Sequence, residues 1–335
     1  MFALTGSNGK TTTKELIIRV LATKYRVQGT MGNLNNHLGV PLTLLALEKN
    51  TEIAIIEMGA NKVGDIAELC GFADPTHGLI TNIGTAHIEG FGGREGVIRG
   101  KSELFDHLRK KSGVVFINQY DHILNNMSKR FTDPHIYPGD GCRFKHAKPF
   151  VEYADEQDRI HATQLIGEYN YINIAAALSV GQYFGIDMDE AHEAICTFEP
   201  SNNRSQLVHA GTNKIILDAY NANPDSMKAA IDNLKHFHAD RKVVLLGSMK
   251  ELGDISDEMH REIVNITSNS EIHQIKFVGE EFHQISEANN PDFFSSSDDL
   301  IAYLKEHPIS NSTVLIKGSR SNEMEKLIKV SEIWH

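Results

Sequence analysis

The 335-residue sequence has little cysteine, no surplus of positive charge and no hydrophobic run long enough to span a bilayer, which takes about 20 residues. Lys and Arg number 33 against 44 Asp and Glu, a net charge of −11, which argues against sequence-independent nucleic-acid binding. Its three cysteines, Cys70, Cys142 and Cys196, are widely spaced, which favours a reducing compartment over disulfides or a zinc site. The first residues show no export signal. We therefore expect a cytoplasmic monomer with no nucleic-acid or membrane partner.

The length and composition predict a two-domain α/β protein. At about 150 residues per domain the chain holds two domains, and 41% hydrophobic with 23% charged residues is typical of globular enzymes. Short apolar runs alternate with amphipathic stretches, which indicates parallel sheets flanked by helices. The polar segment 199–204 is the predicted linker between domains at 1–200 and 201–335. We expect residues 143–165 to form an antiparallel edge of the first domain's sheet. The predicted strands are 2–5, 53–57, 78–81, 114–117, 215–218, 243–246, 275–278 and 314–316.

A phosphate-binding loop is predicted where the first strand meets the first helix. Residues 5–13 read Thr-Gly-Ser-Asn-Gly-Lys-Thr-Thr-Thr. Glycines allow the backbone N–H groups to surround phosphate oxygens, and the helix N-terminus adds partial positive charge. Lys10 would reach the β- and γ-phosphates, and the Thr11 hydroxyl would bind Mg²⁺. Two residues separate the glycines, where the common P-loop has four, so a glycine-rich turn that only caps a helix is the alternative.

Three further residues are candidates for the same site. Glu57 ends a predicted strand, where an acid would lie beside the phosphate loop and bind magnesium. His87 follows another strand toward the same edge, and a surface histidine is its alternative. Lys101 completes the apolar stripe of a helix predicted over 94–108. A lysine on a buried face pairs, extends to solvent or loses its charge, and a neutral amine can react with carbon dioxide to give a metal-binding carbamate.

Several motifs together resemble the Mur ligase family, the ATP-dependent amide ligases of peptidoglycan synthesis. Within the family, the similarity is greatest to the members that add D-alanyl-D-alanine. It extends over essentially the whole chain from residue 2 onward. The family is expected to consist of a P-loop ATPase domain with a mostly parallel sheet followed by a Rossmann-like domain. The resemblance rests on the phosphate loop and on residues 32–43 (GNLNNHLGVPLT), 57–61 (EMGAN), 218–227 (DAYNANPDSM) and 317–320 (KGSR).

The resemblance implies a role for each matching residue. Residues expected to bind ATP are Gly6, Ser7, Asn8, Gly9, Lys10, Thr11, Thr12, Asn170, Asn173, Arg204 and Asp218, with the two asparagines near the adenine. The expected magnesium ligands are Thr11, Glu57, His87 and Lys101, the last as a carbamate. Lys10, His87, Lys101 and Arg204 are expected to serve catalysis. The amino-substrate pocket is expected to include Tyr220, Asn221 and Asn223. Asn223 before Pro224 also reads as a helix N-cap.

The implied reaction activates the terminal carboxylate of UDP-N-acetylmuramoyl-tripeptide with ATP as an acyl phosphate, which the amine of D-alanyl-D-alanine then attacks. ADP and phosphate are the other products. Such a ligase serves cell-wall synthesis, and with it cell shape and division. Closure of the second domain, with Arg204 and Asp218, is expected to exclude water.

The sequence departs from the family in one large respect, because Met1 immediately precedes the phosphate-loop strand. We therefore expect the family's N-terminal domain, which binds the UDP-sugar, to be absent: the chain is a fragment, its start is misassigned, or the domain is supplied in trans. A smaller departure is Leu217, where related members often have a second acid before the aspartate. The alternative functions are an ATP-binding core without ligase activity, another amide ligase such as a folylpolyglutamate synthase, and a general nucleotide hydrolase.

Overall fold

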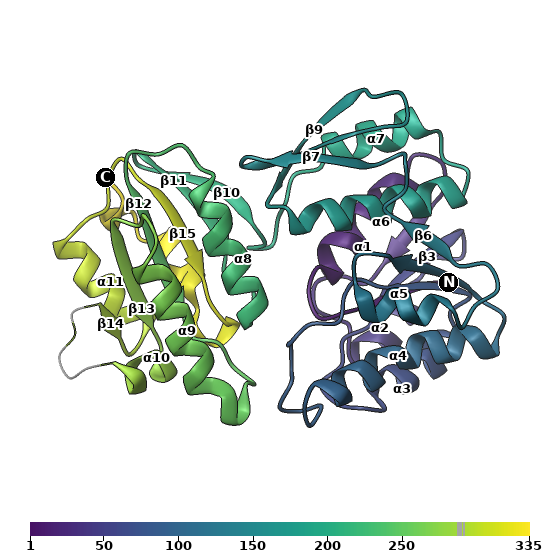
Figure 1. The fold of residues 1–335 in the computed structure, drawn as a ribbon, viewed down its shortest axis with the longest axis horizontal. Helices are drawn as coiled ribbons and strands as arrows, with labels where there is room; N and C mark the ends of the chain where they lie inside the picture. The colour runs from purple at the N-terminus through teal and green to yellow at the C-terminus, as the bar shows by residue number, and fades with distance from the viewer. Residues whose placement is uncertain (287–289, 291) are drawn as a thin grey trace. The chain divides into compact units, whose positions relative to one another are not determined.

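Two six-stranded sheets flanked by helices organise the chain in a computed structural model, which describes residues 1–286, 290 and 292–335 (Figure 1). The first unit comprises residues Met1–His146, Phe150–Gln164 and Glu168–Phe198. The second comprises Ala147–Pro149, Leu165–Gly167 and Glu199–His335. The α/β class expected from the alternating pattern is confirmed.

The sheet of the first unit is parallel throughout, with strand order β2-β3-β1-β4-β5-β6. Its central strands are buried on both faces, which explains their near-continuous apolar sequences. Leu4 pairs with Glu57 and Thr5 with Ile80, so β1, β3 and β4 end side by side at one edge. The strands are β1 (Phe2–Thr5), β2 (Val27–Gly29), β3 (Ile53–Glu57), β4 (His77–Ile80), β5 (Val114–Asn118) and β6 (His135–Tyr137).

Helices cover both faces of this sheet. α1 packs against α6 and α7, and α3 packs against α4, with the two groups on opposite sides of the strands (Figure 1). The second group shares one apolar core with the sheet, including Ile56, Ile80, Leu69 and Leu104. The helices are α1 (Lys10–Leu21), α2 (Gly39–Leu45), α3 (Asp65–Ala73), α4 (Arg94–Lys110), α5 (His122–Ser128), α6 (Tyr169–Tyr183) and α7 (Met188–Cys196).

The segment expected as an antiparallel edge of the first sheet forms a sheet of its own, so that prediction is wrong. The strands β7 (Arg143–Ala147), β8 (Phe150–Ala154) and β9 (Ile160–Ile166) make a separate three-stranded sheet. The edge position belongs to β6, which pairs in parallel with β5. A three-residue strand of mixed burial has too weak an apolar pattern to be recognised beside the longer strands that follow it.

The second unit has strand order β10-β11-β15-β12-β13-β14, antiparallel only between β10 and β11. Its strands are β10 (Gln206–Ala210), β11 (Asn213–Asp218), β12 (Lys242–Gly247), β13 (Gln274–Val278), β14 (Phe293–Phe294) and β15 (Thr313–Lys317). Its helices are α8 (Pro224–Lys235), α9 (Ser256–Ser268), α10 (Glu280–Ile285) and α11 (Ser297–Glu306), with 3₁₀ turns at Gly253–Ile255, Arg320–Asn322, Met324–Lys329 and Ser331–Ile333. β15 lies between β11 and β12, and such a reversal of strand order is where open α/β sheets form ligand crevices at the carboxyl ends.

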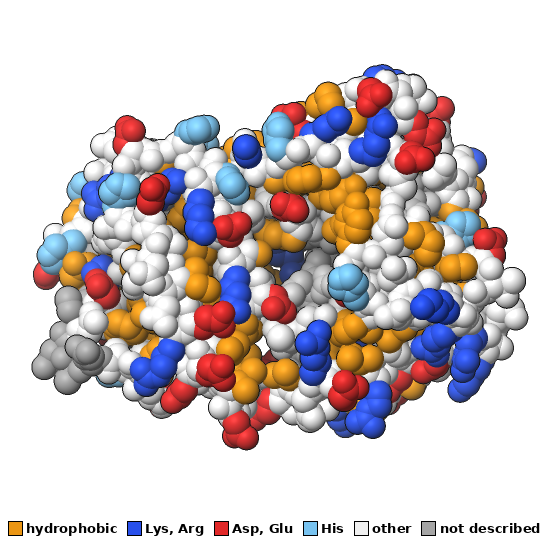
Figure 2. All heavy atoms as spheres, in the orientation of Figure 1, with side chains coloured by type: hydrophobic (Ala, Val, Ile, Leu, Met, Phe, Trp, Pro, Cys, Tyr) orange, Lys and Arg blue, Asp and Glu red, His pale blue; other side chains and the backbone are white. Residues whose placement is uncertain are grey.

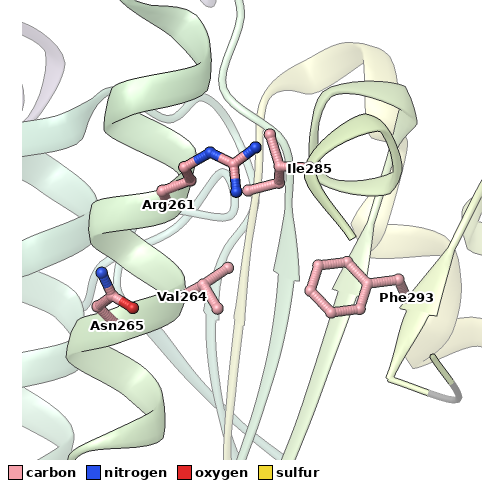
Figure 3. A pocket seen from close by; sticks show the side chains of 5 residues that line it. All are labelled: Arg261, Val264, Asn265, Ile285 and Phe293. Atoms are coloured by element: carbon pink, nitrogen blue, oxygen red, sulfur yellow. The ribbon is translucent and has the colours of Figure 1, made fainter. Parts of the chain in front are cut away.

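Acidic and basic side chains are interspersed over the face of each unit that Figure 2 shows. Within the described residues, no helix is both long and apolar enough to cross a membrane. A hollow in the second unit is lined by Arg261, Val264 and Asn265 of α9 with Ile285 and Phe293 (Figure 3). None of the residues predicted from the sequence to form the site lines this hollow.

Candidate active site

The phosphate loop connects β1 to α1, as predicted, and its two glycines are required by its shape. Gly6 has φ +151° and Gly9 has φ +79°, in the region that side-chain-bearing residues rarely adopt. A Cβ on Gly6 would lie 1.8 Å from Thr81 Oγ1, and one on Gly9 would lie 2.6 Å from Asn173 Oδ1. Thr12 and Thr11 follow in the first turn of α1. Residues of other elements, Thr81 and Asn173, therefore pack closely around the loop.

The segment that follows β4 holds this loop in place. The backbone N–H of Ser7 donates to the Asn82 carbonyl at 3.1 Å, and the Ser7 hydroxyl accepts from the Gly84 N–H at 2.8 Å. Both backbone polar groups of Asn8 are hydrogen-bonded. Its N–H donates to Asn82 Oδ1 at 3.0 Å, and its carbonyl accepts from the Thr81 hydroxyl at 2.6 Å. Two neighbouring parallel strands therefore determine the loop's shape together.

Thr11 and Glu57, the two predicted magnesium ligands nearest the loop, are in direct contact. The Thr11 hydroxyl donates to Glu57 at 3.0 Å from Oε2 and 3.2 Å from Oε1, and both side chains are buried. The amide of Asn35 donates to Glu57 Oε1 at 2.9 Å, and the buried Lys14 ammonium lies 3.8 Å from Oε2. Lys14 also donates to the Thr30 carbonyl at 2.7 Å. Glu57 is thus a compensated buried carboxylate at the end of β3.

This group of donors suits magnesium, which binds oxygen ligands such as carboxylates and hydroxyls. The Lys14 ammonium lies 3.8 Å from Glu57 Oε2, so the buried carboxylate has a basic group beside it as well as the Thr11 and Asn35 donors. Thr11 would present its oxygen to the ion by turning its hydroxyl proton away from Glu57. The pair Thr11 and Glu57 therefore fits the predicted metal role.

Lys101 is buried in α4, at 1% exposure, so the alternative in which it extends to solvent is wrong. Its Nζ lies 5.3 Å from the centroid of the Phe91 ring. Burial, with a further contribution from the Lys10 charge, holds the pKa of Lys101 well below its ordinary value. Burial therefore favours the neutral amine at Lys101, which is the form that reacts with carbon dioxide.

Lys10 begins α1, and His87 lies in the segment between β4 and α4. The Lys10 ammonium donates to the carbonyls of Gly6 at 2.8 Å and Ser7 at 3.3 Å, so its side chain folds over the loop. His87 has a left-handed backbone with φ +59°, and its carbonyl accepts from the Phe91 N–H at 3.2 Å. The half-buried His87 therefore belongs to the turn that carries the Phe91 ring to Lys101.

Asn170 and Asn173, predicted near the adenine, are buried on α6 behind the loop. Asn173 donates to Asn170 Oδ1 at 2.8 Å and accepts from the Thr13 hydroxyl at 2.9 Å. Because Gly9 also packs against Asn173, this asparagine joins α6 to the first turn of α1. Asn173 thus contacts the loop at Gly9, while Thr81 contacts it at Gly6 and Asn8.

Another polar cluster in the first unit has the residue types of a metal site. Ligand atoms of Asp155, His161 and His192 lie within 4.8 Å of one another. However, Asp155 already accepts from Arg159 at 2.6 Å and from His161 at 2.9 Å, and the two imidazoles stack with centroids 4.1 Å apart. Because a guanidinium already supplies the positive charge and parallel rings do not aim at a common point, we interpret the cluster as structural.

The second unit brings Arg204, Asp218 and Tyr220 together at the ends of β10 and β11. Asp218 accepts from the Ser205 N–H at 3.1 Å and from the buried Lys317 ammonium at 2.6 Å. The Arg204 guanidinium stacks on the Tyr220 ring, with its carbon 3.7 Å from the centroid. Arg204 is therefore oriented by its neighbour in sequence and by an aromatic surface.

Asn221 and Asn223 have local structural roles. The Asn221 side chain accepts from the Ala222 N–H at 2.9 Å, and its carbonyl accepts from Lys317 at 3.2 Å. Asn223 is the N-cap of α8 in a capping box with Ser226, whose N–H donates to Asn223 Oδ1 at 2.9 Å. The predicted cap at Asn223, with Pro224 as the first helical residue, is confirmed.

Several residues of the site were not identified from the sequence. They are Lys14, Thr30, Phe91, Thr81 and Asn82. Asn35, Lys317 and Arg320 lie in segments that carried the resemblance, but no role was predicted for them. Lys14 could have been found, because it is a charged residue on the same apolar helix face as Ile17 and Leu21. Lys101 stands out in the same way on α4. The others follow strands or lie on loops, where no periodicity reports tertiary contact.

Comparisons with known proteins agree with this geometry. Residues 4–181 match the model of the Mur ligase middle domain, and residues 203–320 match that of the Mur ligase glutamate ligase domain. A UDP-N-acetylmuramoyl-tripeptide–D-alanyl-D-alanine ligase of Bacillus subtilis (strain 168) is 33% identical over 98% of this chain and 75% of its own length.

Two solved structures have a similar fold. The crystal structure I of MurF from Acinetobacter baumannii is 29% identical, with a TM-score of 0.87, over 99% of this chain and 76% of that one. A MurF ligase from Thermotoga maritima in complex with ADP is 27% identical, with a TM-score of 0.84, over 99% of this chain and 79% of that one. The chain thus spans about three quarters of these relatives.

Proposed function

The chain belongs to the Mur ligase family, and we infer from this membership that it is the ATP-dependent ligase that joins D-alanyl-D-alanine to UDP-N-acetylmuramoyl-tripeptide in peptidoglycan precursor synthesis. The observation that carries this conclusion is the similarity of almost the whole chain to a ligase of that name. The phosphate loop beside a buried acid is the geometry that such an enzyme needs.

The proposed reaction has two steps. A carboxylate oxygen of the tripeptide attacks the γ-phosphorus of ATP, the bond to the β–γ bridging oxygen breaks, and ADP leaves. The amine nitrogen of D-alanyl-D-alanine then attacks the acyl carbon, the bond from that carbon to the phosphate oxygen breaks, and the amine loses a proton as the amide forms. The first step brings two anions together, a carboxylate and a phosphate, so the protein must supply positive charge. Water must be excluded because it would hydrolyse the acyl phosphate.

In the first unit, we propose that the loop residues Gly6 to Thr12 bind the phosphates through backbone N–H groups and through the Lys10 ammonium. Thr11, Glu57, His87 and the Lys101 carbamate would hold magnesium, as the resemblance implies. When bound, magnesium neutralises phosphate charge and orients the transferred group. Asn173 and Asn170 keep the start of α1 in position and are proposed to lie near the adenine.

Lys101 is proposed to carry the carbamate because its amine is buried, and burial favours the uncharged form. The amine nitrogen forms a bond to the carbon of carbon dioxide and releases one proton, which leaves an anion on the new carboxyl group. The neighbouring Lys10 charge, which disfavours an ammonium at Lys101, favours this anion. The position of Lys101 therefore suits an anionic ligand better than it suits a lysine cation.

In the second unit, we propose that Arg204 and Asp218 serve the nucleotide, with Arg204 offsetting phosphate charge. Tyr220, Asn221 and Asn223 are proposed to contribute to the amino-substrate pocket. The contacts of Asn223 within its capping box support a positioning role, because that side chain already stabilises the start of α8.

The test is an assay of ADP release by the 335-residue chain with Mg-ATP, UDP-N-acetylmuramoyl-tripeptide and D-alanyl-D-alanine, with mass spectrometry of the product. We expect ADP release that needs both substrates, together with the pentapeptide product. ATP binding without product would favour the alternative of a nucleotide-binding core. Product from a different amino acid in a substrate panel would favour another amide ligase. The cytoplasmic location and the monomeric state stay predictions.

A further inference from the structure

A second arginine faces the same tyrosine ring that Arg204 covers. The guanidinium carbon of Arg320 lies 5.6 Å from the Tyr220 centroid, while that of Arg204 lies at 3.7 Å. β11 and β15 are parallel neighbours in which Asp218 pairs with Lys317. Tyr220 and Arg320 follow these partners by two and three residues, so both leave the sheet at the same carboxyl edge. The edge thus carries two guanidinium groups around one ring.

Arg320 stands on a rigid turn. The turn begins at Gly318, where a Cβ would lie 2.8 Å from the Gly247 Cα of the neighbouring strand β12. The hydroxyl of Ser319 accepts from the Lys250 N–H at 3.1 Å, and the Asn322 amide donates to the Ser248 carbonyl at 2.8 Å. Contacts on both sides of Arg320 therefore fix its backbone, although the residue itself is exposed.

The positive charges of the two arginines at this edge are not offset by carboxylates, whereas that of Lys317 is. Lys317 is neutralised by Asp218 at 2.6 Å, and that pair is largely buried. Among the described residues, no ion pair joins a carboxylate to the guanidinium of Arg204 or of Arg320, and the buried Nε of Arg204 has no hydrogen-bond partner there. Two guanidinium groups that lie beside one ring and lack a carboxylate are suited to a ligand carboxylate or phosphate.

We propose that Arg320, held against Tyr220, binds the C-terminal carboxylate of the incoming dipeptide D-alanyl-D-alanine. This inference rests on the function proposed above. The dipeptide must be held at its carboxylate end while its amine, at the other end, attacks the acyl carbon. An exposed arginine on a fixed turn at the substrate edge meets that need, while Arg204 is left for the nucleotide phosphates. Tyr220 is the positioning residue that the two arginines share.

The test compares binding of D-alanyl-D-alanine with binding of its C-terminal amide, which lacks the negative charge, by calorimetry in the presence of Mg-ADP. For the wild type we expect the acid to bind about 10- to 100-fold more tightly than the amide, as one charge-assisted contact predicts. Arg320→Gln should bind both ligands about equally. Arg261→Gln, at an exposed arginine of α9 in the same unit, is the matched control and should keep the wild-type preference.

The dependence on Tyr220 separates a positioned arginine from a mobile one. Tyr220→Leu removes the ring and should reduce the preference for the acid, and Tyr220→Phe should reduce it less. An equal affinity of the wild type for acid and amide, or no binding of either, would overturn the proposal. A loss of ADP affinity in Arg320→Gln with the acid preference retained would assign Arg320 to phosphate and would overturn it as well.

Failure of the ligase function is recognised separately, because the binding measurement does not need the UDP-linked substrate. If the chain prefers the acid through Arg320 but makes no pentapeptide, this inference holds and the proposed function is wrong. If the chain makes the pentapeptide and Arg320→Gln still prefers the acid, the proposed function holds and this inference is wrong.

Discussion

The hydroxyl of Thr11 donates to the carboxylate of Glu57 at 3.0 Å, across the gap between the first helix and the end of β3. These residues are far apart in sequence, and the parallel pairing of β1 with β3 brings them together. The contact joins the part of the loop that would bind phosphate to the acid that would bind magnesium. We therefore expect phosphate binding and magnesium binding to depend on each other.

Glu57→Gln should abolish magnesium-dependent turnover, because the amide keeps the shape of Glu57 but loses the charge. We expect kcat/KM to fall by roughly 100-fold or more, as several kcal/mol of charge stabilisation imply. The measurement is ADP release as a function of magnesium concentration. Glu52→Gln, at an exposed acid just before the same strand, is the control. Wild-type turnover in Glu57→Gln would remove Glu57 from the metal site.

Lys101→Met should abolish activity and yet raise stability at low pH. Between the lowered pKa of Lys101 in the folded chain and the ordinary lysine value, the unfolded chain binds a proton that the folded chain lacks. The free energy of unfolding of the wild type therefore rises with pH through this range. Methionine removes that dependence, so the variant should exceed the wild type at pH 6 by more than at pH 9.

Thermal denaturation in carbon-dioxide-free buffer at both pH values measures this difference in stability. A parallel sample kept in bicarbonate and analysed by intact mass should show a carbamate on the wild type and none on Lys101→Met. Equal melting temperatures at all pH values would contradict a neutral buried amine.

Gly9→Ala should damage the phosphate loop more than the backbone conformation alone explains. Gly64 has φ +99°, and a Cβ added there would have nothing within 4 Å, so Gly64→Ala should cost only the roughly 1–2 kcal/mol of a left-handed alanine. In Gly9→Ala the new Cβ also meets Asn173 Oδ1 at 2.6 Å, which should add about 1–3 kcal/mol. Urea denaturation and ATP binding measure the difference, and similar results for the two variants would refute it.

Asp218→Asn should destabilise the second unit, because it leaves the buried Lys317 ammonium without its carboxylate at 2.6 Å. Breaking a buried ion pair from one side costs roughly 3–5 kcal/mol. The double variant Asp218→Asn/Lys317→Met removes the stranded charge and should recover much of that loss. Urea denaturation of the wild type, both single variants and the double variant measures the coupling. Additive losses would show that the pair contributes little to stability.

Arg204→Ala should lower kcat far more than it lowers ATP affinity. Its guanidinium is oriented by Tyr220 and is proposed to offset charge that develops during phosphoryl transfer, which affects the transition state more than the ground state. We expect kcat to fall by roughly 100-fold or more. ADP release and equilibrium ATP binding are compared, with Arg241→Ala, an exposed arginine of the same unit, as the control. Equal losses in turnover and affinity would contradict this role.

Much of the fold could be predicted because the central strands are buried on both faces. Runs such as Ile53–Glu57 and Lys242–Gly247 are therefore nearly all apolar and stand out from the amphipathic helices. The strands β2, β6 and β14 have two or three residues of partial burial, so they leave no comparable pattern. The small sheet β7-β8-β9 was placed wrongly because alternation identifies strands and not their partners.

The site could be predicted in part for a related reason. Thr11 lies on a recognisable loop and Glu57 ends an apolar run, so strand topology alone brings them to one edge. Lys101 interrupts a helical stripe, which is a one-dimensional signal of burial. Asn173 beneath Gly9 and Arg320 beside Tyr220 depend on how elements distant in sequence pack, and local patterns do not report that.

The hydrogen bonds from the Thr81–Gly84 segment to Ser7 and Asn8 bear on how this loop can be reused. Residues 5–13 transplanted into another α/β scaffold would bring the chemistry of Lys10 and Thr11 without the partners that shape the loop. A design that is to keep the shape of this loop must therefore transfer the ends of both β1 and β4. For the same reason, most members of a library that varies only the loop would lose the hydrogen bonds from the Thr81–Gly84 segment that hold the loop in shape.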